Sequence, residues 1–204
     1  AGMMDCKKAL TETNGDMEAA IDLMRTSGAA KAAKKAGRVA AEGLVNVTIS
    51  DDNKTAIILE INSETDFVAK GDEFINFVNT LGELALKTEP ADIDAFMAES
   101  MENGDSLEKA REDIIAKIGE NISIRRVQTV KTDSGVIGAY KHGDRIAVLT
   151  TLEGGDATLA KDVAMHVAAT KPECVSEEQL SDEILEREKA IFVEQARESG
   201  KPDN

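Results

Sequence analysis

The first forty residues carry the apolar spacing of short helices. Residues 4–13 predict one helix, which Asn14-Gly15 ends, and Asp16 is placed to cap the next. Ser27-Gly28 predicts the end of this second helix, and the Ala-rich stretch that follows predicts a third. Residues 1–38 therefore predict a small helical module, which buries little surface by itself.

From Gly43 the apolar pattern changes to the period of a strand. Two runs rich in β-branched residues, 44–49 and 56–61, flank a polar turn at 51–53, which is a hairpin signal. The pattern then predicts a helix between Asp72 and Pro90, helices over 93–101 and 106–119, and a strand over 121–130.

The same plan starts again at Gly135. Two strands surround the turn 141–144, and a helix follows that Asp156 can cap and Pro172 ends. The order glycine, strand, turn, strand, helix thus occurs twice, which predicts a degenerate repeat of two α+β units with antiparallel sheets. The second unit lacks a third strand and continues into an acidic helix, about 182–198.

These patterns divide the chain into four segments. We expect the helical module over 1–38, with its first helix missing, a first core subdomain over 39–132, an incomplete second one over 133–175, and a final helical segment over 176–204. The last helix has apolar residues but no partner helix after it, as in one half of an antiparallel helical hairpin. The alternative is that it packs on its own domain.

Composition narrows the class of protein. Hydrophobic residues make up 42% of the 204 residues but aromatic ones only 3%, so the core must consist of Ala, Leu, Ile, Val and Met. The apolar runs are too short for a membrane span or a secretory signal, so no membrane partner is expected. Cys6 and Cys174 form no ligand cluster, which favours a reducing, cytoplasmic setting and excludes a structural zinc site.

The formal net charge of −15 argues against broad contact with a phosphate backbone. Basic residues nevertheless concentrate in the first segment, at Lys31, Lys34, Lys35 and Arg38. This cluster is either a small nucleic-acid patch or the solvated face of an Ala-rich helix. The alanines between the charges favour the helix, so we expect no direct nucleic-acid partner.

Catalytic chemistry has little support in this sequence. His142 and His166 stand in no recognisable catalytic motif, and no Gly-x-x-x-x-Gly-Lys-Ser/Thr loop is present. We therefore expect no enzyme active site, no cofactor and no metal. A small acidic hydrolase stays as an alternative, which needs a substrate pocket around one of the two histidines.

The connection over residues 62–72 is the strongest candidate site. It is much longer than its counterpart at 153–156, and it places Phe67 and Val68 outside both the strand and the helix patterns. An apolar pair on a rigidly held loop is one way in which proteins bind partners. The alternative is a short helical turn capped by Thr65, with Phe67 folded onto the core.

Two further places are weaker candidates. His166 falls beside the apolar stripe of its helix, where a histidine is usually a packed residue. Met3-Met4 belongs either to the core or to an adaptable contact surface.

Residues 60–70, Glu-Ile-Asn-Ser-Glu-Thr-Asp-Phe-Val-Ala-Lys, closely resemble the signature of the translation elongation factor Ts family. The opening residues 1–10, Ala-Gly-Met-Met-Asp-Cys-Lys-Lys-Ala-Leu, resemble the N-terminal signature of that family. Further similar segments are Lys117 to Ile122 with Arg125-Arg126, Tyr140 to Ile146, Met165 to Ala169, and Lys171 to Glu173. The resemblance covers essentially the whole chain in order.

This resemblance implies a guanine-nucleotide exchange factor that binds elongation factor Tu and releases GDP. It also implies a ubiquitin-associated-like helical module, two pseudo-symmetric core subdomains and a helical-hairpin arm, with a possible homodimer through the arm. Thr65, Asp66, Phe67 and Val68 would form the loop that disturbs the partner's Mg²⁺ site, Phe67 as the wedge. Ile146 and His166 would contact the partner from the second subdomain, and Met3, Met4 and Lys7 from the helical module. The alternative is a ubiquitin-associated-type adaptor that tethers a partner without accelerating nucleotide release.

Overall fold

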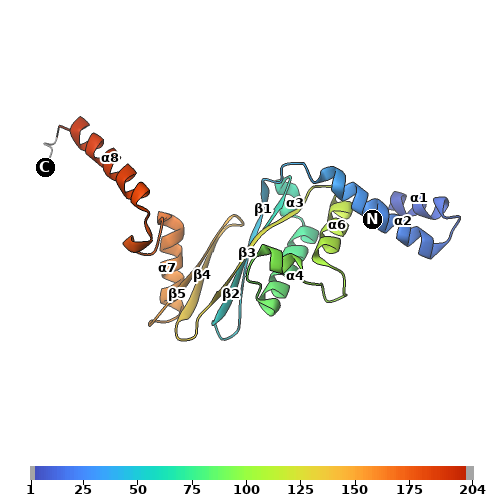
Figure 1. The fold of residues 1–204 in the computed structure, drawn as a ribbon. Coiled ribbons are helices and arrows are strands. Elements are labelled where there is room, and N and C mark those ends of the chain that lie inside the picture. Colours follow the sequence, from blue (N-terminus) through green and yellow to red (C-terminus); the bar gives the residue numbers. More distant parts are fainter. Residues whose placement is uncertain (1–2, 201–204) are drawn as a thin grey trace. The chain divides into compact units, whose positions relative to one another are not determined.

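The computed structural model describes residues 3–200, which form helices and two small antiparallel sheets (Figure 1). This confirms the predicted α+β class. The elements are α1 Met3–Glu12, α2 Met17–Lys35, β1 Glu42–Ile49, β2 Thr55–Ser63, α3 Asp66–Ala69, α4 Asp72–Thr88, α5 Ile93–Met97, α6 Leu107–Ile118, β3 Ser123–Lys131, β4 Val136–His142, β5 Ile146–Leu152, α7 Ala157–Thr170, a short 3₁₀ helix Glu177–Gln179, and α8 Asp182–Glu198.

The chain separates into two compact units, one ending at Ala168 and the other beginning at Ala169. The predicted segments 1–38 and 176–204 also include residues 1–2 and 201–204, which lie outside the described residues. None of the helices within residues 3–200 combines the length and the apolarity that crossing a membrane requires.

The first sheet has the order β1-β2-β3, with β2 in the centre. Ile57, Leu59 and Ile61 alternate along β2 and are completely buried. They share one core with α4, whose apolar residues recur at helical spacing, as the stripe over this segment predicts. The inward-facing residues of β2 and of α4 therefore form a single hydrophobic core, which consists mainly of aliphatic side chains.

The helix α2 corrects one prediction, because it runs through Ser27-Gly28 without a break. Gly28 is buried, and a β-carbon there would lie 3.6 Å from the β-carbon of Ala116 on α6. Ala32, one turn further on, belongs to the same core as the first sheet. The small residue thus serves the close packing of two helices, and the predicted end of the helix at this point was wrong.

The second sheet pairs β4 with β5, and α7 packs on it. The cap on α7 forms as predicted, since the Asp156 carboxylate accepts a hydrogen bond from the Leu159 amide at 2.9 Å. On α7 only Ala160 and Ala164 are fully buried, and Leu159 is half exposed. Among the described residues this sheet has two strands, one fewer than the first sheet.

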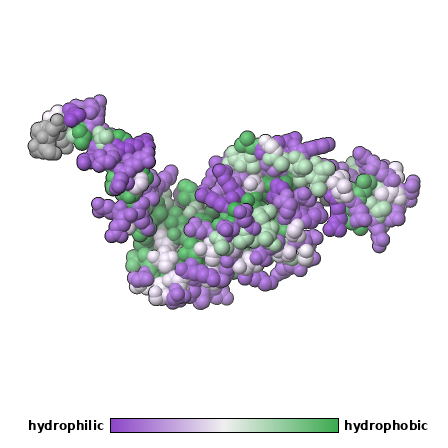
Figure 2. Space-filling model, in the orientation of Figure 1, coloured by the Kyte–Doolittle hydropathy of each residue, from purple (hydrophilic) through white to green (hydrophobic). Residues whose placement is uncertain are grey.

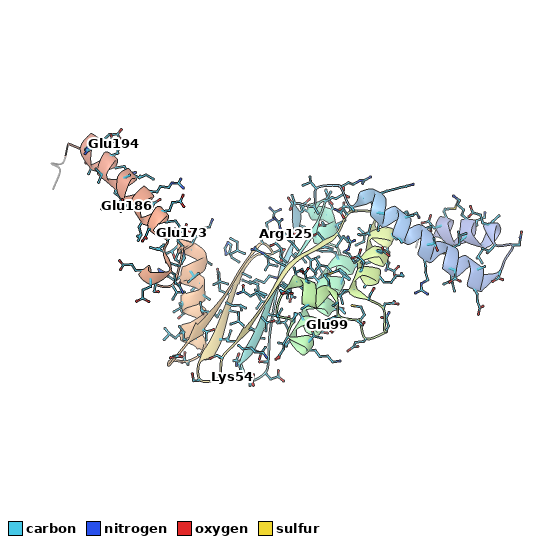
Figure 3. The ribbon with its side chains drawn as sticks, in the orientation of Figure 1. Lys54, Glu99, Arg125, Glu173, Glu186 and Glu194 are labelled. Atoms are coloured by element: carbon cyan, nitrogen blue, oxygen red, sulfur yellow. The ribbon has the colours of Figure 1, made fainter. Side chains whose placement is uncertain are left out.

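Both ends of the β1–β2 hairpin are joined to the second sheet. Lys54 lies in the turn of this hairpin (Figure 3). Its ammonium donates to the Gly135 carbonyl at 2.6 Å, and the Ile137 amide donates to the Asn53 carbonyl. At the other end, the Val45 amide donates to the Asp144 carbonyl at 2.8 Å. Main-chain bonds thus connect the two repeats.

The second compact unit begins at the end of α7 and contains the 3₁₀ helix and α8. Ser181 caps α8 by accepting a hydrogen bond from the Ile184 amide, and no residue of α8 is buried. Acidic side chains such as Glu186 and Glu194 project along it (Figure 3), and apolar residues are exposed among hydrophilic ones (Figure 2). The predicted helix over 182–198 is confirmed at both ends.

Candidate functional site

The connection between β2 and α4 contains a single helical turn, α3. Thr65 has an extended backbone and caps this turn, since its hydroxyl oxygen accepts a hydrogen bond from the Val68 amide at 3.4 Å. The turn closes at Lys70, whose amide donates to the Asp66 carbonyl. The helical turn capped by Thr65, which the sequence left as an alternative, is therefore present.

The two apolar side chains of this turn point in different directions. Phe67 is 85% exposed, whereas Val68 packs against the hydrophobic core and Ala69 is buried. Helical geometry produces this split, because successive residues are rotated by about 100° around the axis. Phe67 therefore does not fold onto the core, and that alternative for the aromatic ring was wrong.

Asp66 lies next to Phe67 and forms an ion pair with Lys70 at 2.8 Å. The hydrogen bond from the Lys70 ammonium lowers the pKa of Asp66, and the same bond raises the pKa of Lys70. Both groups are solvent-exposed, so the pair adds little to stability.

A carboxylate from a distant segment holds the start of this loop. Glu120 accepts hydrogen bonds from the amides of Glu64, at 3.1 Å, and Thr65, at 3.0 Å, and from the Thr65 hydroxyl at 2.6 Å. In return, the Glu64 carboxylate accepts the Asn121 amide hydrogen at 2.6 Å. The site predicted from the sequence omits Glu120, because nothing in the local pattern around residue 120 points to a loop more than fifty positions earlier.

Beside Phe67 lies an open hollow of about 610 Å³. Its apolar lining comes from Val68, Phe74 and Ile118, so it joins α3, the start of α4 and the end of α6. Asp72, Glu73 and Glu120 also line this hollow, so the exposed ring stands beside a mixed surface of apolar and acidic residues.

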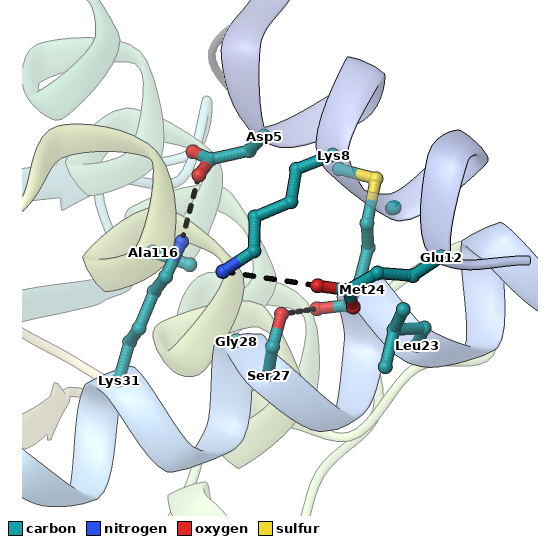
Figure 4. Close-up of a pocket in the computed structure, with 10 residues that line it drawn as sticks. Asp5, Lys8, Glu12, Leu23, Met24, Ser27, Gly28, Lys31 and Ala116 are labelled. Atoms are coloured by element: carbon teal, nitrogen blue, oxygen red, sulfur yellow. Dashed lines mark hydrogen bonds and ion pairs between the residues drawn. The ribbon is translucent and has the colours of Figure 1, made fainter.

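The helical-module candidates lie on α1. Met3, Met4 and Lys7 are all exposed, whereas Ala9 faces α2 and is buried. The alternative that the two methionines belong to the core was therefore wrong. Figure 4 shows the small pocket of about 160 Å³ between α1 and α2, bordered by the ion pairs Lys31–Asp5 and Lys8–Glu12.

The remaining candidates, Ile146 and His166, lie on different elements. Ile146 begins β5, is partly exposed, and lines a groove of about 400 Å³ together with Val45 and Ile58 of the first sheet. His166 is exposed in the second half of α7. Neither residue belongs to the surface around Phe67.

Contacts within the chain occupy three members of the basic cluster. Lys31 pairs with Asp5, the Lys35 ammonium donates to the Gly119 carbonyl, and Arg38 lies 3.6 Å from the Glu64 carboxylate. These contacts favour a structural role for the cluster over a nucleic-acid patch.

A hydrogen-bonded loop that presents an aromatic ring and a hollow to solvent is typical of a protein-binding surface. The loop of residues 64–70 is therefore the candidate protein-binding surface of this chain.

Comparison with known proteins makes the assignment specific. The sequence model of the family described as Elongation factor TS matches residues 64–204. The chain is 74% identical to elongation factor Ts of Ruthia magnifica subsp. Calyptogena magnifica, over all of this chain and 69% of that protein. It is 66% identical to elongation factor Ts of Vesicomyosocius okutanii, over all of this chain and 70% of that protein. It is 52% identical to elongation factor Ts of Legionella pneumophila strain Lens, over 99% of this chain and 69% of that protein. The chain belongs to the elongation factor Ts family and is a translation elongation factor.

Proposed function

We propose that this chain is a guanine-nucleotide exchange factor that binds elongation factor Tu and promotes the release of GDP. The observation that carries the proposal is the 85% exposure of Phe67 on a loop that the Glu120 carboxylate fixes in place. The chain forms no covalent bond in this process, so it acts as a binding factor without a cofactor of its own. We place this activity in the cytoplasm.

The loop acts on the partner's nucleotide site by displacement. Phe67 inserts between elements of the GTPase domain, and Asp66 brings a negative charge towards the groups that hold Mg²⁺. Since the ion neutralises the phosphates of GDP, moving its ligands weakens nucleotide binding. The coupling is reciprocal, because a factor that weakens GDP binding is itself bound less tightly while GDP is present.

Several contacts have to act together. Burial of one phenylalanine contributes only about 1.5–3 kcal/mol, which is small beside the binding free energy of a nucleotide. In the proposal, Thr65 and Val68 shape the turn, Met3, Met4 and Lys7 dock the helical module, and Ile146 and His166 contact the partner from the second repeat. The segments 1–38, 39–132, 133–175 and 176–204 then serve as helical module, two core subdomains and arm.

The test is release of fluorescent GDP from purified elongation factor Tu, followed with and without the chain. We expect Phe67→Ala to slow the accelerated release roughly tenfold or more, and Asp66→Ala to add to that defect. Phe192→Ala is the matched control, because it removes an exposed phenyl ring from α8. We expect this control to accelerate GDP release as much as the unaltered chain does.

Each outcome has a distinct meaning. Unchanged release with Asp66 and Phe67 both replaced contradicts the loop assignment. Binding of the partner without any acceleration by the unaltered chain favours the alternative, an adaptor that tethers elongation factor Tu.

A further inference from the structure

The amides of Glu64 and Thr65 follow the point where sheet pairing stops. The last residues of β2 that pair with β3 and β1 are Asn62 and Ser63, respectively. Two main-chain donors therefore emerge from the sheet without a ladder partner, in a partly buried position. The Glu120 carboxylate accepts both of them, which satisfies groups that would otherwise lose their hydrogen bonds on folding.

The same carboxylate also determines the cap of α3. A hydroxyl group has one hydrogen, and Thr65 donates it to Glu120 at 2.6 Å. The lone pairs of this oxygen then remain available for the Val68 amide, which lies 3.4 Å away. Through this relay, Glu120 stabilises the helical turn that holds Phe67 outward and Val68 inward.

The residue after Glu120 connects the loop to the linker that follows α2. The side-chain amide of Asn121 donates to the Arg38 carbonyl at 2.8 Å, and its main-chain amide donates to Glu64. Hydrogen bonds thus join residues 36–38, 64–65 and 120–121 at one junction. The start of the loop that carries Phe67 is therefore hydrogen-bonded to the turn after α6, and through Asn121 it is connected to the end of the helical module.

We propose that Glu120 is a positioning residue for nucleotide exchange, which orders the loop of Thr65 to Lys70 before the partner arrives. The inference rests on the proposed function. An ordered loop presents the competent conformation in nearly every molecule, whereas a loose one presents it in a fraction and loses exchange rate in proportion. Glu120 itself acts through the turn that carries Phe67.

The test uses Glu120→Gln, which keeps the size of the side chain but replaces one acceptor oxygen by a donor, and Glu120→Asp, which keeps both oxygens. Glu83→Gln, an exposed position on α4, is the control for loss of one charge. Hydrogen exchange in the free chain reports the amides of residues 64–68. GDP release from elongation factor Tu, measured over a range of chain concentrations, gives the maximal rate and the half-saturating concentration.

We expect Glu120→Gln to lose protection at residues 64, 65 and 68 and to lower the maximal release rate roughly tenfold. The half-saturating concentration should change less, because the other contact surfaces remain intact. Glu120→Asp should recover part of both losses, and Glu83→Gln should lose neither. In an Asp66→Ala/Phe67→Ala background, Glu120→Gln should add no further defect, since its effect runs through the two side chains that the turn presents to the partner.

A general loss of stability gives a different pattern. It adds to the defect of the Asp66→Ala/Phe67→Ala variant, and it lowers protection throughout β2 as well as in the loop. That pattern overturns the positioning role, as does an unchanged maximal rate in Glu120→Gln. If the unaltered chain itself fails to accelerate GDP release, the proposed function and this inference both fail. If the unaltered chain accelerates release but Glu120→Gln does so equally well, only the inference fails.

Discussion

Gly138 illustrates how a single residue sets the distance between α7 and β4. It is buried, and a β-carbon at this position would overlap the carbonyl carbon and the β-carbon of Ala160 on α7. These are backbone and near-backbone atoms, which cannot move without shifting the whole helix. Glycine is therefore required here by a close approach of two elements rather than by a turn.

We expect Gly138→Ala to lower the free energy of unfolding by about 1–3 kcal/mol, because the added methyl group overpacks this contact. Gly37→Ala is the matched control, since a β-carbon there meets no atom within 4 Å. Urea unfolding measures both variants. Equal stability of Gly138→Ala and the unaltered chain would show that α7 moves away from the sheet at little cost.

Glu108 links acidity to the stability of α6. Its carboxylate accepts from the Arg111 guanidinium at 3.0 Å, and Arg111 also donates to the Ile122 carbonyl. The hydrogen bond from Arg111 lowers the pKa of Glu108 below its ordinary value of 4.5. A lowered pKa in the folded chain means that the pair stabilises the fold above the unfolded value and loses this effect as the pH falls through the folded value.

We therefore expect Glu108→Gln to be less stable than the unaltered chain at pH 7, and the difference to shrink as the pH is lowered below about 4.5. Urea midpoints of both proteins between about pH 2 and pH 7 measure this difference. A constant difference over the whole range would show that the ionised form of Glu108 is not what Arg111 stabilises.

At the scale of elements, the contact between α2 and α6 depends on small residues. Gly28 faces Ala116, and Ala32 is buried in the core one turn later. We expect Ala32→Leu to destabilise the chain by about 1–3 kcal/mol, because three extra carbon atoms have to be accommodated between packed helices. Ala33→Leu, on the exposed side of α2, should be close to neutral. Thermal unfolding followed by circular dichroism compares the two, and similar midpoints would contradict the tight packing of α2 on α6.

At the scale of the whole molecule, α8 differs from the core in how it is stabilised. It has no buried residue, while Ile184, Leu185 and Phe192 are 40–65% exposed. A helix of this length is marginal in water without tertiary contacts. We expect its amides to exchange at least tenfold faster than those of the buried strand β2, as measured by hydrogen exchange with mass spectrometry.

The concentration dependence of this exchange tests the predicted homodimer through the arm. If two copies pair along α8, its protection rises with protein concentration while that of β2 stays constant. Protection of α8 equal to that of β2 at the lowest concentration would contradict a marginal helix.

Much of the fold could be predicted from the sequence, because its signals are local. Asp16 and Asp156 both cap helices as their spacing predicts, and the hairpins form around the predicted polar turns. Gly28 shows where this reasoning fails, since a glycine that ends a helix and one that packs against another helix look the same in sequence.

The sequence by itself determined the elements of this protein, their repeated order and, through the resemblance of residues 60–70, its family. Hydrophobic periodicity, helix caps and turns depend on residues that are close together in the sequence, so they can be recognised without knowing the fold. The tertiary structure alone decided that Phe67 points to solvent, that Val68 packs inward, and that Glu120 holds the loop. These features depend on contacts between segments far apart in the chain, and such contacts exist only after the core has brought α6, β2 and β3 together.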